Sequence, residues 1–158
     1  MSNDLISRRA FCANGGQALT LVSLASLGGV LQGCGGSSTS PSDAPELPTI
    51  NSAIAGGAIT MTIDASSPLN AVGGAALVQA SGQSFLVSQT SAGSFTALTA
   101  ICTHEQCTVT GFQSSQYVCP CHGSRYSISG AVVQGPASQS LRSFPTKFAS
   151  PVLTITVA

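Results

Sequence analysis

The sequence predicts an all-β protein, a small antiparallel β-sandwich or barrel with stacked sheets. In ITMTI, residues 59–63, apolar side chains alternate with threonine, which is the period of a strand with one buried face. No helical stripe of apolar residues follows residue 34. Turn dipeptides separate further short runs at Ser81-Gly82, Ala92-Gly93 and Ser129-Gly130.

The composition limits the protein to one domain and a targeting segment. The chain has 158 residues, 43% hydrophobic and only 6% charged, with a formal net charge of zero. Its five basic residues form no patch beyond an N-terminal pair, so the electrostatic footprint of a nucleic-acid-binding protein is missing. That class is excluded.

The first 33 residues resemble a twin-arginine export signal. Arg8 and Arg9 precede Phe11 and a moderately apolar stretch, 18–31, which is shorter than the roughly 20 residues that a spanning helix needs. That export route carries folded proteins, often with a cofactor already bound. The alternative is that the arginines are ordinary flanking charge of a signal or membrane anchor.

Cys34 ends the apolar stretch in a sequence, LQGC, that resembles a lipobox, so we expect lipid attachment at this cysteine. The alternative is an uncleaved membrane helix in which Cys34 has no role. In both cases the domain lies on the extracytoplasmic, periplasmic side of a bacterial membrane. Residues 34–52, rich in serine and proline, predict a flexible linker, and 53–158 the folded domain.

The strands of that domain follow in order after the alternating stretch from Ala58. Each run is short, contains β-branched or aromatic residues, and is bounded by turn signals. The expected ranges are 76–80, 84–89, 94–100, 116–119, 125–129, 131–134, 141–146 and 152–157.

Two short motifs, CTHEQC (102–107) and CPCH (119–122), hold four of the six cysteines and both histidines. Placed in loops between strands, they would meet in space. Thiolate and imidazole together favour zinc or iron–sulfur chemistry over calcium or magnesium. Two alternatives stay open at this point: a zinc site of Cys102, His104, Cys119 and His122, and two plain disulfides in an exported domain.

The two motifs, with Gly123 and Ser124 after the second, resemble the paired boxes of Rieske iron–sulfur proteins. The resemblance implies a β-sheet fold with a cluster-binding loop subdomain and one [2Fe-2S] cluster per chain. By it, Cys102 and Cys119 bind one iron, His104 and His122 bind the other, and Cys107 and Cys121 form a disulfide. It also implies that the hydroxyls of Ser124 and Tyr126 donate hydrogen bonds to cluster sulfurs, and that Gly135 and Pro136 belong to a loop that covers the cluster.

The ligand set predicts a high-potential one-electron carrier. Replacing two thiolates by neutral imidazoles removes two negative charges, so an added electron meets less repulsion. The signal and the extra cysteine pair resemble the cytochrome bc type, which implies a quinol or cytochrome b-type donor and a cytochrome c-type acceptor. An oxygenase catalytic subunit needs further histidines for a mononuclear iron, and the chain has only two.

Three points stay open. Glu105 and Gln106 depart from the bc-type motif, which puts quinol docking in doubt. The alternative is a lipid-tethered electron carrier, for instance the small subunit of a molybdenum oxidase. From another class comes a surface lipoprotein with disulfide-bonded loops and no iron. Alone, the chain should catalyse nothing beyond moving one electron.

Overall fold

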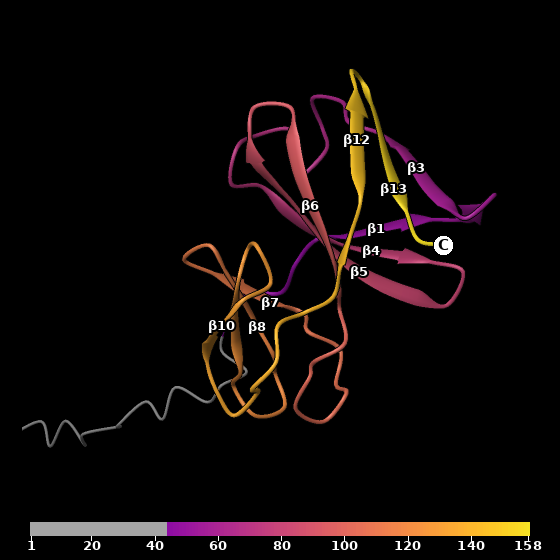
Figure 1. Cartoon of the computed structure of the whole chain (residues 1–158). Coiled ribbons are helices and arrows are strands. Elements are labelled where there is room, and N and C mark those ends of the chain that lie inside the picture. The colour runs from indigo at the N-terminus through magenta and orange to yellow at the C-terminus, as the bar shows by residue number, and fades with distance from the viewer. Residues whose placement is uncertain (1–43) are drawn as a thin grey trace, which may run out of the picture. The chain divides into compact units, whose positions relative to one another are not determined.

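The computed structural model describes residues 44–158, and every regular element in that range is a β-strand (Figure 1). The all-β prediction is confirmed. The strands form three sheets. Neighbouring strands in each sheet are antiparallel, except that β1 (Thr49–Ser52) is parallel to β4 (Ala75–Ala80).

The central sheet has five strands in the order β1-β4-β5-β6-β11. The bounds of the last three are β5 (Gln83–Ser91), β6 (Ser94–Thr99) and β11 (Ser143–Phe144). The β4–β5 hairpin turns through Ser81 and Gly82, both with positive φ, as a tight two-residue connection requires.

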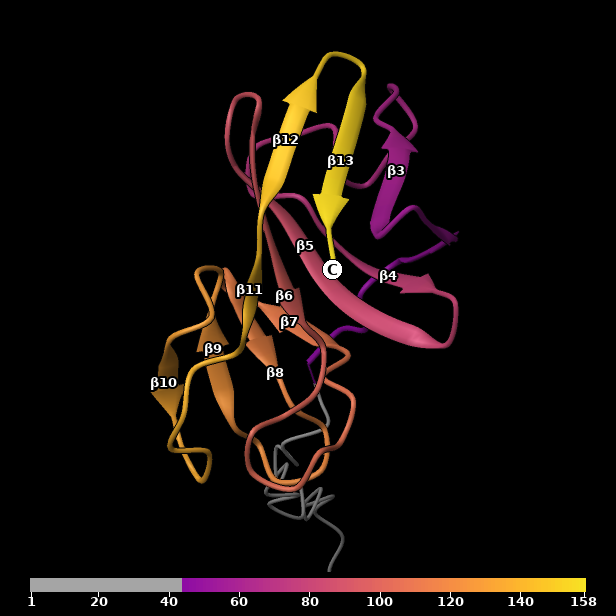
Figure 2. The same ribbon diagram turned by 45° about the vertical axis from the view of Figure 1, so that its right-hand side comes forward.

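A four-stranded sheet with the order β12-β13-β3-β2 packs on one side of the central sheet. Its strands are β2 (Ile54–Ala55), β3 (Ala58–Thr62), β12 (Thr146–Ala149) and β13 (Val152–Thr156), with β12, β13 and β3 side by side in Figure 2. Ile59 and Ile155 are fully buried in the core shared with Val78, Phe85 and Val87 of the central sheet.

The third sheet, order β10-β9-β8-β7, packs on the other face of the central sheet. It consists of β7 (Gly111–Gln113), β8 (Gln116–Val118), β9 (Arg125–Ser127) and β10 (Val132–Gln134). Tyr117 and Tyr126 face each other across β8 and β9 and pack with Leu86 and Leu98. Successive residues of a central strand point to opposite faces of the sheet, and each face packs in a core. Almost every residue in the middle of β5 is therefore buried.

Two expectations about the elements need correction. The expected strand 141–146 is split at Pro145, which has no N–H for a ladder; the chain before it pairs with β6 and the chain after it with β13. The end of the expected linker is folded: Leu47 is buried in the core, and β1 pairs with β4, so the folded part begins before residue 53.

Candidate metal centre

The two cysteine–histidine motifs form two loops with the same backbone hydrogen bonds. The CTHEQC loop joins β6 to β7, and the CPCH loop joins β8 to β9. In the first, the Cys102 N–H donates to the Cys107 carbonyl (2.8 Å), and the Gln106 N–H donates to Cys102 (2.9 Å). In the second, the Cys119 N–H donates to Ser124 (2.8 Å), and the Gly123 N–H donates to Cys119 (3.0 Å). Each loop is thus closed by bonds to its first cysteine.

The fourth residue after that cysteine has positive φ in both loops: 58° at Gln106 and 72° at Gly123. Glycine adopts this conformation freely, whereas glutamine pays a conformational cost there. The repeated geometry brings the first cysteine of each loop to a corresponding position, facing the other loop.

Cys102 and Cys119 are buried free thiols, each 1% exposed. The rings of His104 and His122 lie edge to face, with centroids 4.9 Å apart, and the His122 side chain is 45% exposed. Two sulfur donors therefore lie inside the protein, and two nitrogen donors lie nearer its surface. The structure thus pairs the two predicted sulfur ligands, Cys102 and Cys119, and the two predicted nitrogen ligands, His104 and His122.

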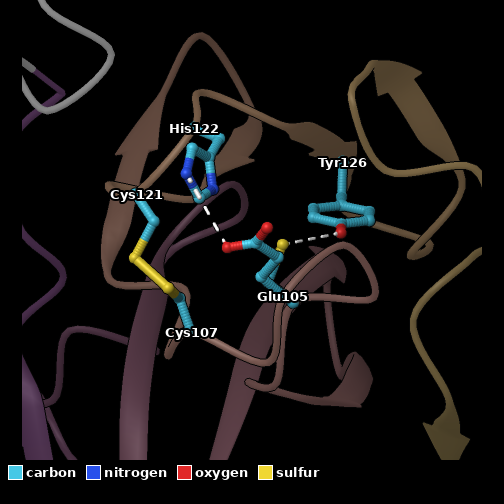
Figure 3. The surroundings of a disulfide bond; sticks show 6 residues. Glu105, Cys107, Cys121, His122 and Tyr126 are labelled. Atoms are coloured by element: carbon cyan, nitrogen blue, oxygen red, sulfur yellow. Dashed lines mark hydrogen bonds and ion pairs between the residues drawn. A yellow bond between two sulfur atoms is a disulfide. The ribbon is translucent and has the colours of Figure 1, made fainter.

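The other two cysteines of the motifs form the disulfide Cys107–Cys121, which joins the two loops (Figure 3). The predicted pairing is confirmed. The Cys119 sulfur lies within 4.8 Å of both disulfide sulfurs. A domain held by two disulfides is not what the structure has, because Cys102 and Cys119 remain thiols.

The Tyr126 hydroxyl lies 3.2 Å from the Cys102 sulfur (Figure 3). It accepts a hydrogen bond from the Thr103 N–H at 3.1 Å, so its own proton is available for a second partner. Burial raises the pKa of the Cys102 thiol, but hydrogen bonds from Tyr126 and from the His104 backbone outweigh burial, and this pKa lies below its ordinary value. Burial and the neighbouring Cys102 raise the pKa of Cys119 instead.

The chain after β10 touches both loops. The Ser124 hydroxyl, fully buried, accepts a hydrogen bond from the Ala137 N–H at 3.0 Å. The Thr103 hydroxyl donates to the Gln139 carbonyl at 2.6 Å. Gly135 and Pro136 lie exposed just before these contacts, and their role in covering a cluster stays a prediction.

A family model described as the Rieske [2Fe-2S] domain matches residues 60–145. The chain belongs to the Rieske [2Fe-2S] family. The domain implies a [2Fe-2S] cluster, and the donors fit one: two thiols and two imidazoles converge from two loops, while the other two cysteines are already bonded to each other.

The relatives of this Rieske protein include cytochrome b6-f complex iron-sulfur subunits. The one from Chlorobaculum thiosulfatiphilum is 34% identical over 67 residues, 42% of this chain and 37% of the relative. That from Prochlorococcus marinus (strain MIT 9211) is 51% identical over 45 residues, 28% of this chain and 25% of the relative. The matched part thus spans well under half the length of these relatives.

Two solved structures share the Rieske fold with this chain. The cyanobacterial plasma membrane Rieske protein from Synechocystis has a TM-score of 0.51 and 24% identity, over 60% of this chain and 97% of the other. Naphthalene 1,2-dioxygenase has a TM-score of 0.52 and 16% identity, over 63% of this chain and 26% of the other. At these identities the likeness supports the fold alone.

Some expected features of the Rieske protein lie outside the described residues: the signal arginines Arg8 and Arg9, and the lipidation site Cys34. In the described range, 44–158, no helix has the length and apolar character to cross a bilayer. Sequence reasoning missed Thr103, whose bonds to Tyr126 and Gln139 link residues more than twenty positions apart. Only its place beside Cys102 could have pointed to it.

Proposed function

We propose that this protein carries single electrons on a [2Fe-2S] cluster. Cys102 and Cys119 bind one iron, and His104 and His122 bind the other. The observation that supports this assignment is the pair of buried free thiols facing a disulfide-bonded pair, because it leaves one two-sulfur, two-nitrogen donor set.

When bound, the cluster supplies a one-electron site whose charge falls on its sulfurs. The chain's residues would then set how readily it accepts the electron. The Tyr126 hydroxyl donates toward the Cys102 sulfur, and Ser124, whose oxygen already accepts from Ala137, keeps its proton for a sulfur. Both donors favour the more negative, reduced state and raise the potential.

The exposure of His122 gives electrons a short route to a partner. We propose that the domain works on the extracytoplasmic face of a membrane, as the iron–sulfur subunit of a quinol–cytochrome c reductase-type chain. The donor is then a quinol or cytochrome b-type protein, and the acceptor a cytochrome c-type protein. The b6-f subunits among its relatives support this proposal.

A second candidate is a lipid-tethered carrier for another periplasmic oxidoreductase, such as the small subunit of a molybdenum oxidase. Glu105 favours it, because this carboxylate is 62% exposed beside His122 and makes the tip less suited to an apolar quinol pocket.

Mössbauer spectroscopy tests the ligand assignment. The expected spectrum of the reduced protein has two inequivalent irons, one ferric with sulfur ligands and one ferrous with nitrogen ligands. Two equivalent sulfur-bound sites, or no iron, would contradict it. Deleting the gene distinguishes the two candidate functions, with quinol–cytochrome c reductase activity measured in membranes. Loss of this activity supports the first candidate function. Unchanged activity supports the second.

A further inference from the structure

A groove crosses one end of the central sheet and reaches the CTHEQC loop. It consists of two adjoining cavities, of about 330 Å³ and about 460 Å³, and both are lined by Thr99, Ile101 and Arg142. The first cavity extends to the β4–β5 hairpin, and the second extends to His104. No residue of the CPCH loop lines either cavity, so the groove is separate from the space between the two ligand loops.

The floor of the first cavity is aromatic. Phe85 and Phe144 both line it and pack edge to face, with their ring centroids 5.1 Å apart. Ile101, which pairs with Thr108 at the base of the CTHEQC loop, is 39% exposed beside them. A hollow with an apolar floor and an exposed apolar wall can take an apolar side chain of a partner protein.

Arg142 carries the one positive charge on this groove apart from His104. Its guanidinium lies over the Phe144 ring, 4.8 Å from the ring centroid. Such stacking orients the guanidinium plane and leaves its N–H groups free to bind a carboxylate in a bidentate manner. The Thr99 N–H donates to the Arg142 carbonyl at 2.8 Å, where β11 begins to pair with β6 (Figure 2), so the backbone beneath this side chain is also fixed.

No carboxylate in residues 44–158 neutralises Arg142, because the one ion pair in that range joins Glu105 to His122. The other two acidic residues there are Glu46, paired with β7, and Asp64, on the turn after β3. The groove therefore presents an unpaired cation beside apolar surface. Its complement is a surface that carries a carboxylate beside an apolar side chain.

We propose that this groove docks a c-type cytochrome with an acidic contact surface. Arg142 pairs with a carboxylate of the cytochrome, and an apolar side chain of the cytochrome fills the hollow over Phe144. Docking there brings the haem close to His104, and the reduced protein gives one electron to the ferric haem, which becomes ferrous. The inference rests on the proposed function and adds the surface that binds the acceptor and the charge that the acceptor carries.

Stopped-flow kinetics tests the docking surface. The reduced, cluster-loaded protein is mixed at low ionic strength with an acidic or a basic c-type cytochrome, and the second-order rate constant is measured. Residues 44–158 contain three acidic and three basic side chains, so local charge decides the preference rather than net charge. The wild type should react faster with the acidic cytochrome.

Arg142→Glu should slow the reaction with the acidic cytochrome about tenfold, because like charges meet in the contact. It should speed the reaction with the basic cytochrome, and high salt should reduce both effects. Lys147→Glu is the matched control: it makes the same change of charge on β12, outside the groove, and should change the rates far less. An equal loss of rate in Lys147→Glu, an unchanged rate in Arg142→Glu, or a wild type that prefers the basic cytochrome overturns the inference.

Ile101→Ala tests the apolar part of the groove. It should slow the reaction with the acidic cytochrome at high salt as well as at low salt, because the lost contact is uncharged. Its control is Val133→Ala, on β10 and 52% exposed, which should react as the wild type does. Equal rates for these two variants overturn the inference.

The midpoint potential of each variant is measured as well. A loss of rate that a changed midpoint fully explains also overturns the docking surface. A wild-type protein without a cluster signal, or one that reduces neither cytochrome, contradicts the proposed function instead.

Discussion

At the residue scale, the environment of the buried sulfurs depends on which hydroxyl groups donate hydrogen bonds to them. The Tyr126 oxygen accepts from the Thr103 N–H, while the Thr103 hydroxyl is committed to the Gln139 carbonyl. The phenolic proton is left to the Cys102 sulfur or to the Thr103 oxygen, which lies 3.1 Å away. Replacing the phenol therefore removes the one proton that these two acceptors share, without opening a large cavity.

Tyr126→Phe should leave the cluster in place and lower its midpoint potential. A net hydrogen bond of about 1 kcal/mol corresponds to roughly 40 mV for one electron. A redox titration followed by paramagnetic resonance measures the shift. Tyr117→Phe is the matched control, because the Tyr117 hydroxyl is also buried and, within the described residues, is not bonded to a cysteine sulfur. If both variants keep the wild-type midpoint, Tyr126 has no tuning role.

Ser124→Ala should lower both the midpoint and the stability. The Ser124 oxygen accepts the Ala137 N–H at 3.0 Å, and removing it leaves a buried N–H without its partner, which costs about 1–3 kcal/mol. Urea unfolding of the loaded protein measures the second effect. A lower midpoint with unchanged stability would show that Ala137 does not depend on this bond.

Much of this chemistry could be predicted from residue types. The motif residues Cys102, His104, Cys119 and His122 were each found because cysteine and histidine are rare in the chain and clustered. The contacts of Thr103 and Glu105 could not be predicted in the same way. Threonine and glutamate are ordinary surface residues, and their partners, Gln139 and His122, are set by how three loops pack.

At the element scale, the two ligand loops are separate connections, β6 to β7 and β8 to β9, and one covalent bond joins them. Each loop closes its own backbone ring, and three contacts join the tips of the two loops: the disulfide, the Glu105–His122 pair and the edge-to-face rings of His104 and His122. The two cysteines of the disulfide are 14 positions apart in the sequence. Closing a loop of that size stabilises a fold by about 3 kcal/mol, because it lowers the conformational entropy of the unfolded chain.

The double variant Cys107→Ser with Cys121→Ser should lose stability of that order, about 3 kcal/mol, and release its iron faster. Denaturant unfolding and the rate of iron transfer to a chelator measure these effects. The two serines keep the size of the side chains, so packing changes little. An iron-release rate equal to that of the wild type would mean that the loops hold together without the bond.

Leu47 tests where the folded unit begins. It is 6% exposed and packs in the core that also contains Tyr117 and Cys119, although the sequence placed it in a linker. Leu47→Ala should destabilise the domain by about 2–5 kcal/mol in urea unfolding, because it leaves a cavity. The control is Val72→Ala, at a side chain 61% exposed, which should change stability by less than about 0.5 kcal/mol. Equal changes in stability for the two variants would mean that Leu47 belongs to the linker and not to the folded domain.

The strands that sequence reasoning located are those with clear alternation or turn signals, such as β3 and the β4–β5 hairpin. β1 was missed because the segment PELPTINS contains two prolines and resembles a linker, yet it gains stability from parallel pairing with β4. β7 is too short, at three residues, for its pattern to stand out. The local sequence pattern cannot predict such a strand pairing, because the partner strand is distant in the sequence.

At the scale of the folded unit, the central sheet packs against both of the other sheets, one on each face. The central strands bury one face against the β12-β13-β3-β2 sheet and the other against the small sheet that carries the CPCH loop. The CTHEQC loop leaves the central sheet at β6, so the two ligand loops come from different layers. Their relative position then depends on the shared core, and loss of packing there should also loosen the metal centre.

Low-temperature paramagnetic resonance on protein purified from membranes tests the central claim most directly. A cluster with two neutral nitrogen ligands has a high potential, so the mild reductant ascorbate alone should produce a rhombic signal. The contradicting result is silence after both ascorbate and dithionite, together with zinc in place of iron by elemental analysis.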